Sequence, residues 1–111
     1  DSEDAIDAAT AISGSGPGYI FTLIDAFEKA AKKIGFSNQI SRELILATIL
    51  GSVKLMEYTN KEPKDLANSI AVKGGTTEAA VKVLLKKNID NTMYSAVSAA
   101  YKKASKLGKD K

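Results

Sequence analysis

The chain has 111 residues, of which 44% are hydrophobic and 26% are charged, and these values are typical of one soluble globular domain spanning residues 1–111. It contains neither Cys nor His, which excludes disulfides, most zinc sites and Ser–His or Cys–His nucleophiles, and is compatible with a cytoplasmic protein. Arg42 is the single Arg among 16 Lys and Arg residues, so base-specific nucleic-acid recognition is disfavoured, and no apolar run reaches the ~18 residues that a membrane span needs.

The first predicted helix covers Asp4 to Ile12 and leads into a run of small residues. This run, Ser13-Gly14-Ser15-Gly16-Pro17-Gly18, predicts a bend, because serial glycines destabilise a helix and Pro fits only its first turn. It matches neither the G-x-x-x-x-G-K-[ST] nor the G-x-G-x-x-G phosphate loop, and no strand is predicted before it. Close packing where helices cross is therefore favoured over phosphate binding.

The second predicted helix carries apolar residues at spacings of three and four, which is the pattern of an amphipathic helix. Gly35 is expected to end this helix, and either Ser37 or Ser41 is expected to cap the next one. The apolar stripe consists of Ile20, Leu23, Ile24, Phe27, Ala31 and Ile34.

The next predicted helix, from Leu44 to Met56, is apolar on every side and carries one charge, Lys54. A helix without a polar face must be covered all round, and a chain of this length has little room to enclose one. We therefore predict that a second subunit covers it. A central helix surrounded by its own chain is the alternative.

A short helix is predicted to begin at Glu62-Pro63, and a second glycine bend, Lys73-Gly74-Gly75-Thr76-Thr77, opens another helix. Exposed backbone N–H groups and the helix dipole at this bend suit a small anion such as a carboxylate, and the two threonines add hydroxyl groups. An ordinary helix start, with Gly75 or Thr76 as the cap, is the alternative.

Asp90 is expected to cap a last helix whose apolar stripe runs from Met93 to Ala104. The Lys-rich end of this helix is interpreted as a solvated helix terminus rather than an anion-binding tail, because cations are favoured there. No stretch has a convincing period of two, so the sequence predicts an all-α fold of about five helices.

Two motifs resemble those of the pyrroline-5-carboxylate reductase family. The run from Asp7 to Tyr19 resembles that family's D-x-x-T-A-x-S-G-S-G-P-A-Y motif, and the stretch from Pro63 to Thr77 is similar to the one that ends in its S-P-G-G-T-T signature. The resemblance spans Ser2 to Leu107. Members of the family reduce 1-pyrroline-5-carboxylate to L-proline with NADPH or NADH, and they combine an N-terminal Rossmann domain with a helical C-terminal domain.

The resemblance implies that this chain is the helical half of such an enzyme, without the Rossmann half, and that it is a piece of a longer protein. The helical domains of two subunits would interleave into a homodimer, which in some members assembles further into a decamer. The chain alone would then be inactive, with no metal, nucleic acid or membrane among its partners.

The same resemblance assigns roles to two segments. Gly74, Gly75, Thr76 and Thr77 would bind the substrate carboxylate, and the hydroxyl of Thr77 would approach the ring nitrogen as the catalytic group. Thr10 would lie near the nicotinamide carboxamide of the cofactor.

One departure from the family pattern favours a different function. Val72-Lys73 stands where the family usually has Ser-Pro, so a substrate hydrogen bond and a rigid turn residue are both missing. A non-catalytic helical dimerisation module derived from the family is therefore the alternative.

Overall fold

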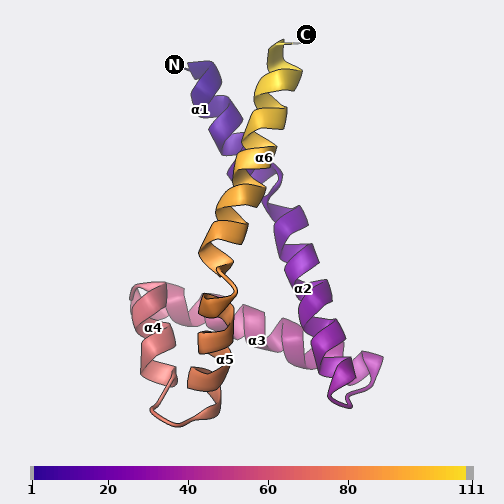
Figure 1. Cartoon of the computed structure of the whole chain (residues 1–111), viewed down its shortest axis with the longest axis vertical. Helices are drawn as coiled ribbons and strands as arrows, with labels where there is room; N and C mark the ends of the chain where they lie inside the picture. Colours follow the sequence, from indigo (N-terminus) through magenta and orange to yellow (C-terminus); the bar gives the residue numbers. More distant parts are fainter. Residues whose placement is uncertain (1, 110–111) are drawn as a thin grey trace. The chain divides into compact units, whose positions relative to one another are not determined.

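The structure, a computed structural model, describes residues 2–109, and no strand occurs within that range. The all-α prediction is confirmed. Six α-helices and one π-helical turn follow one another along the chain (Figure 1). They are α1 (Ser2–Ala9), η1 (Thr10–Gly14, the π-helix), α2 (Gly16–Lys33), α3 (Asn38–Thr59), α4 (Pro63–Ile70), α5 (Thr76–Lys86) and α6 (Ile89–Lys109).

The chain divides into two compact units. The first unit combines the residues up to Phe21 with those from Leu84 onward, and the second unit is Thr22–Val83. In the first unit α1, η1 and α6 pack on one another, and Figure 1 shows α1 and α6 crossing. Ala11, in η1, is only 1% exposed, and its small methyl side chain is compatible with close packing of η1 against its neighbours.

The predicted bend at residues 13–18 is wrong in its extent. Gly14 ends the π-helix, Ser15 is the only non-helical residue, and α2 already begins at Gly16. The N–H of Ser15 donates to the carbonyl of Thr10 over 2.8 Å, which is the five-residue spacing of a π-helix. Pro17 is tolerated because the first turn of a helix has no acceptor for its missing N–H.

Two residues fix the junction between α2 and α3 as the sequence predicted. Gly35 has φ +119°, and the N–H of the following Phe36 donates to the Ala31 carbonyl over 3.1 Å, which closes the end of α2. The Oγ of Ser37 accepts from the N–H of Ile40 over 3.1 Å, so Ser37 is the N-cap of α3. Ser41, the other candidate cap, lies inside α3.

An ion pair joins α2 to α3 at the same junction, within the second unit. The guanidinium of Arg42 donates to both carboxylate oxygens of Glu28, at 3.2 Å for the Nη2–Oε1 contact. Glu28 is only 8% exposed, and the hydrogen bond from Arg42 holds the pKa of its carboxyl below the usual value of 4.5. The single Arg of the chain therefore has a structural partner.

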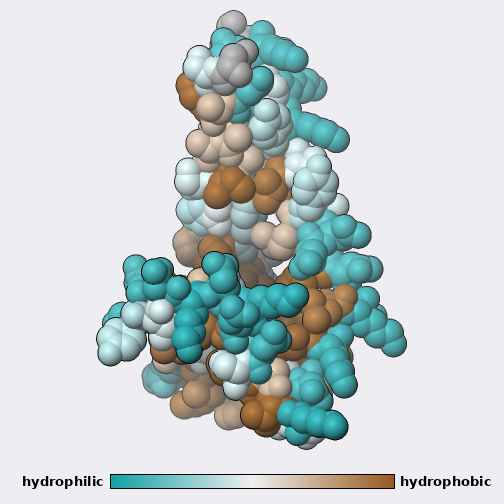
Figure 2. Space-filling model, turned by 90° about the vertical axis from the view of Figure 1, so that its left-hand side faces the viewer, coloured by the Kyte–Doolittle hydropathy of each residue, from teal (hydrophilic) through white to brown (hydrophobic). Residues whose placement is uncertain are grey.

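The apolar side chains of α3 are largely uncovered. Ser41 and Ile45 are the buried residues of this helix, whereas Leu50 is 56% exposed and Val53 50% exposed. Figure 2 shows brown, hydrophobic atoms open to solvent on one face of the molecule. This exposure is opposite to the alternative prediction, in which the chain itself would surround the helix. The other exposed large hydrophobic residues of α3 are Ile40, Leu44, Leu46, Leu55, Met56 and Tyr58.

Exposed apolar side chains such as those of α3 are typical of a chain that completes its core with another chain.

Candidate functional site

The second glycine bend forms a tight turn between α4 and α5. The N–H of Val72 donates to the Ile70 carbonyl, and the N–H of Gly75 donates to the Val72 carbonyl, both over 2.9 Å. Gly74 has φ +77°, a left-handed conformation that L side chains rarely adopt. Thr76 is the first residue of α5, so the prediction of a helix start at this bend is confirmed.

Gly75 has no room for a side chain. A Cβ atom at this position would lie 2.8 Å from Cγ2 of Val72 and 3.1 Å from the Val72 carbonyl oxygen. Both glycines of the bend are thus required, Gly74 by its backbone conformation and Gly75 by its neighbour.

Three backbone N–H groups at the start of α5 have no acceptor in the described part of the chain, namely those of Thr76, Thr77 and Glu78. The first-turn N–H groups of a helix point away from it and carry the positive end of its dipole. Thr76 is exposed and Thr77 is half-buried. These two donors suit a small anion, while the N–H of Gly75 is occupied by Val72 within the turn.

Glu78 reaches back to this turn from the first turn of α5. Its Oε1 accepts from the N–H of Gly74 over 3.1 Å and lies 3.7 Å from Nζ of Lys82. Glu78 was not among the site residues predicted from the sequence. The (i, i+4) spacing of Glu78 and Lys82 was the available signal.

Thr10 lies in the π-helical turn of the first unit. Its hydroxyl donates to the Ile6 carbonyl over 2.9 Å, which leaves the oxygen lone pairs free to accept. The Gly74–Thr77 bend belongs to the second unit, so the two predicted site segments are each placed within their own unit.

Tyr19 ties the start of α2 to the π-helix. Its hydroxyl donates to the Ala11 carbonyl over 2.5 Å, and Ser13 donates to the Ala9 carbonyl over 2.9 Å. Both bonds join a side chain to the backbone in or next to the π-helical turn. The small-residue run is therefore held rigidly around Thr10 by its own hydroxyl groups.

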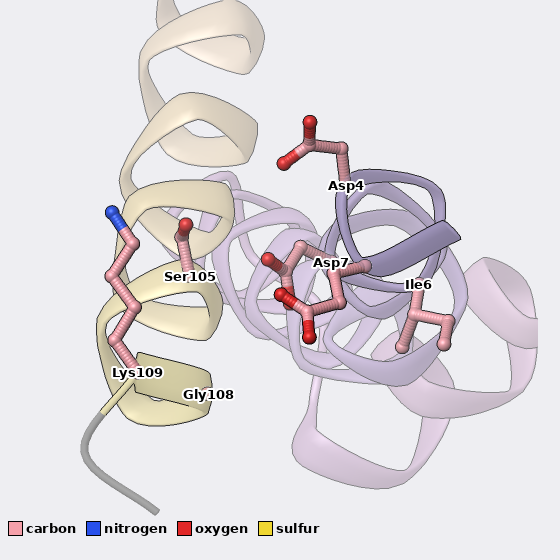
Figure 3. Close-up of a pocket in the computed structure, with 7 residues that line it drawn as sticks. Asp4, Ile6, Asp7, Ser105, Gly108 and Lys109 are labelled. Carbon is pink, nitrogen blue, oxygen red and sulfur yellow. The ribbon is translucent and has the colours of Figure 1, made fainter. Parts of the chain in front are cut away.

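Hollows in the described surface lie away from the bend, and two of them differ in character. One lies between α1 and α6, and Figure 3 shows the carboxylates of Asp4 and Asp7 on one side and Ser105 and Lys109 on the other. No group of three residues that could hold a metal ion occurs in residues 2–109. The second hollow, between α3 and α4, is mainly apolar and is lined by Ser52, Leu55, Met56, Pro63, Leu66, Ala67 and Ile70.

The chain matches a known protein family over nearly its whole length. Residues 3–107 match the family model described as "Pyrroline-5-carboxylate reductase dimerisation". The chain belongs to the pyrroline-5-carboxylate reductase dimerisation family. The family resemblance predicted from the two motifs is thereby confirmed.

Relatives of this family match the chain over nearly its whole length. Pyrroline-5-carboxylate reductase 2 of Bacillus subtilis is 34% identical over 95% of the chain, and pyrroline-5-carboxylate reductase of Synechocystis is 36% identical over 96%. The chain spans only 38% and 40% of the length of these two relatives. It therefore corresponds to about two fifths of a complete reductase.

Solved reductase structures share the fold of the chain. The Plasmodium falciparum pyrroline carboxylate reductase with NADP bound superposes with a TM-score of 0.91 at 35% identity, covering 95% of this chain and 40% of that one. The Coxiella burnetii pyrroline-5-carboxylate reductase gives a TM-score of 0.91 at 36% identity, covering 96% and 40%. The helical dimerisation fold of the reductases is thus the fold of this chain.

No helix within residues 2–109 is long and apolar enough to cross a membrane.

Proposed function

We propose that the complete protein is a pyrroline-5-carboxylate reductase, which reduces 1-pyrroline-5-carboxylate to L-proline with NADPH or NADH. Residues 1–111 would be its single helical domain for dimerisation and substrate binding. The observation that carries the proposal is the Gly74–Thr77 bend, where the N–H groups of Thr76 and Thr77 are unengaged at the positive end of α5. The family motif and this geometry point to the same residues.

The reaction requires the bend to hold a cyclic imine that carries a carboxylate. The N–H groups of Thr76 and Thr77 donate to the carboxylate, and the glycines let the substrate approach the backbone closely. The hydroxyl of Thr77 orients the ring nitrogen, which takes up a proton when the imine carbon is reduced. The protein thus supplies placement and electrostatics.

The nicotinamide cofactor supplies the hydride when it is bound. Residues 1–111 contain no dinucleotide fingerprint, so most of the cofactor site belongs to a part of the protein outside this chain. Thr10 fits a contact with the carboxamide amino group, because its hydroxyl oxygen has lone pairs left to accept a hydrogen bond. The chain on its own is accordingly expected to be inactive.

The family description supports dimerisation, and the surfaces that pair in the dimer are part of the proposal. Two copies would cover each other's α3, which carries the exposed apolar side chains described above. Further association into a decamer and a cytoplasmic location belong to the same proposal, with neither nucleic acid nor membrane as a partner.

Substitution of Thr77 by Ala in the full-length protein tests the site. We expect kcat/KM for pyrroline-5-carboxylate to fall about ten- to a hundredfold, since a hydrogen bond to a charged or developing group contributes about 1.5–3 kcal/mol. The KM for the nicotinamide cofactor should change less than about twofold. Thr92→Ala, in the first turn of α6, is the control with the same change of side chain. A kinetically silent Thr77→Ala would remove the substrate site and leave only dimerisation.

A non-catalytic dimerisation module is the second candidate, favoured by Val72-Lys73 in place of Ser-Pro. Val72 is 63% exposed, so its side chain adds no core packing to offset the loss of a polar group. A full-length protein that forms the dimer but shows no turnover with either nicotinamide cofactor would establish this alternative.

A further inference from the structure

The carboxylate of Glu78 accepts a hydrogen bond from one N–H group of the bend. This N–H group would otherwise be available to an anion. The carboxylate accepts from Gly74 over 3.1 Å, and the side chain of Glu78 is only 31% exposed. Lys82, one helical turn further along α5, lies 3.7 Å from the same oxygen. A negative charge is thus held at the helix N-terminus by two contacts, one to the backbone and one to a cation.

This contact divides the donors of the bend into two groups. The N–H of Gly74 is used by Glu78 and that of Gly75 by the Val72 carbonyl, whereas those of Thr76, Thr77 and Glu78 have no acceptor within residues 2–109. The donors left open to an incoming carboxylate therefore belong to the first turn of α5, beginning with Thr76 and Thr77. The left-handed Gly74, with φ +77°, lacks a Cβ to restrict it, so the side-chain bond of Glu78 limits its freedom.

We propose that Glu78 is the positioning residue of the substrate bend: it fixes the Gly74 N–H so that the substrate carboxylate is directed to Thr76 and Thr77. This inference rests on the proposed reductase function. Glu78 itself does not bind the substrate. Lys82 has a supporting role, because it offsets the charge of Glu78, which would otherwise repel a substrate of the same sign across a short distance.

The test compares Glu78→Ala with Glu78→Gln in the full-length enzyme. Removing the side chain frees the turn, so we expect the KM for pyrroline-5-carboxylate and the inhibition constant of L-proline to rise about tenfold. The kcat, the KM for the cofactor and the thermal midpoint should stay close to those of the wild type. Glu78→Gln should restore the KM to within about twofold, because an amide oxygen also accepts from Gly74.

The control is Asp25→Ala, which removes an exposed (i, i+4) pair with Lys29 of the same type but far along the chain from the bend. Asp25→Ala should leave kcat, the KM values for substrate and cofactor, and the inhibition constant of L-proline unchanged. A Glu78→Ala enzyme with a lower thermal midpoint and an unchanged KM would overturn the proposal, since the role would then be only structural. Equal effects of Ala and Gln would overturn it too, because charge and not the hydrogen bond would be responsible.

A second variant keeps the proposal testable if Glu78→Ala does not fold. Lys82→Met leaves Glu78 on Gly74 but removes the compensating cation, so the KM for the substrate should rise about threefold at low salt and return toward the wild-type value at high salt. If the substrate KM of Lys82→Met equals that of the wild type at low salt, the proposal is contradicted. If Thr77→Ala leaves kcat/KM unchanged, the proposed reductase site is wrong. If Thr77→Ala lowers kcat/KM while all Glu78 and Lys82 variants keep the wild-type KM, only the proposed role of Glu78 is wrong.

Discussion

Gly75 illustrates how one missing methyl group determines the geometry of the bend. A Cβ atom here would meet Val72 at both its side chain, 2.8 Å away, and its carbonyl oxygen, 3.1 Å away. Gly75→Ala should therefore push the turn apart and lower kcat/KM of the full-length enzyme about tenfold, since overpacking typically costs about 1–3 kcal/mol.

The structure also provides a compensating change. Val72→Ala removes the 2.8 Å contact but leaves the backbone one, so the double variant with Gly75→Ala should recover part of the lost activity. Val72→Ala alone is the control and should be nearly neutral at a side chain that is 63% exposed. No recovery in the double variant would mean that the backbone contact alone is responsible.

The Glu28–Arg42 pair makes a prediction about pH. The pKa of Glu28 is lowered in the folded chain, mainly by the hydrogen bond from Arg42. A carboxyl whose pKa is lower in the folded state stabilises fully above its usual value of 4.5, and this stabilisation is lost as the pH falls through the folded value. Below pH 4.5 the urea midpoint of the wild type should therefore fall more steeply than that of Glu28→Gln.

The comparison needs a carboxyl without such a partner. Glu43 is exposed and accepts only from the Gln39 amide, over 3.3 Å, so Glu43→Gln should retain the acid slope of the wild type. If Glu28→Gln also retains that slope, the ion pair does not contribute to acid stability.

At the residue scale, the sequence was informative about position and not about contacts. The two glycines and two threonines predicted a helix start, because these residue types satisfy its backbone requirements. The bond from Glu78 to Gly74 and the contact between Gly75 and Val72 depend on the φ angle of Gly74 and on a side-chain rotamer. Neither quantity follows from residue type, so these contacts could not be predicted.

At the scale of the elements, the start of α3 distinguishes two serines that were equivalent N-cap candidates in the sequence. Ser37 accepts from the backbone of Ile40, whereas Ser41 is fully buried and its Oγ has no hydrogen-bond partner among the described residues. Ser37→Ala should lower the free energy of unfolding by about 1 kcal/mol. Ser41→Ala should be neutral or stabilising, because it removes a buried, unpaired hydroxyl group.

Urea denaturation of the two variants, measured at one protein concentration, checks this difference. Equal losses at both serines would show that Ser41 has a partner in the assembled protein. A loss at Ser41 alone would contradict the assignment of Ser37 as the cap.

The helix boundaries that the sequence predicted correctly are those where one residue type is nearly obligatory. Gly35 ends α2 with a positive φ, and Pro63 begins α4. The π-helix was not predictable in this way. Its register depends on hydroxyl bonds to Ile6 and Ala9 and on packing against α6, which is about eighty residues further along the chain. Helical periodicity alone does not contain this long-range contact.

For the whole molecule, the main question is what buries the exposed apolar side chains of the second unit. The sequence predicted that α3 would be apolar all round, and the structure confirms that its chain leaves it largely exposed. Single-chain patterns predict such a surface but not the residues that would cover it, which we propose belong to a second copy. The family description, which names dimerisation, supplies that copy.

We therefore predict that the 111-residue chain is a stable dimer at micromolar concentration, as measured by analytical ultracentrifugation. Folding would then be coupled to association, so the thermal midpoint should rise with protein concentration by mass action. A well-folded monomer with a midpoint independent of concentration would contradict this prediction.

Leu50→Asp tests whether α3 is the surface that pairs. Leu50 is 56% exposed in the chain, so a charge there costs little in an isolated monomer but would be buried without a partner in the dimer. Removing one partner of a buried ion pair, the nearest measured analogue, costs about 3–5 kcal/mol, which corresponds to a dissociation constant raised more than about a hundredfold. Lys102→Asp, at an exposed position of the Lys-rich end of α6, is the control and should leave the dimer intact. Because the two variants both introduce one Asp, a dimer that survives Leu50→Asp would place the interface on another face, whereas loss of the dimer in Leu50→Asp alone assigns it to α3.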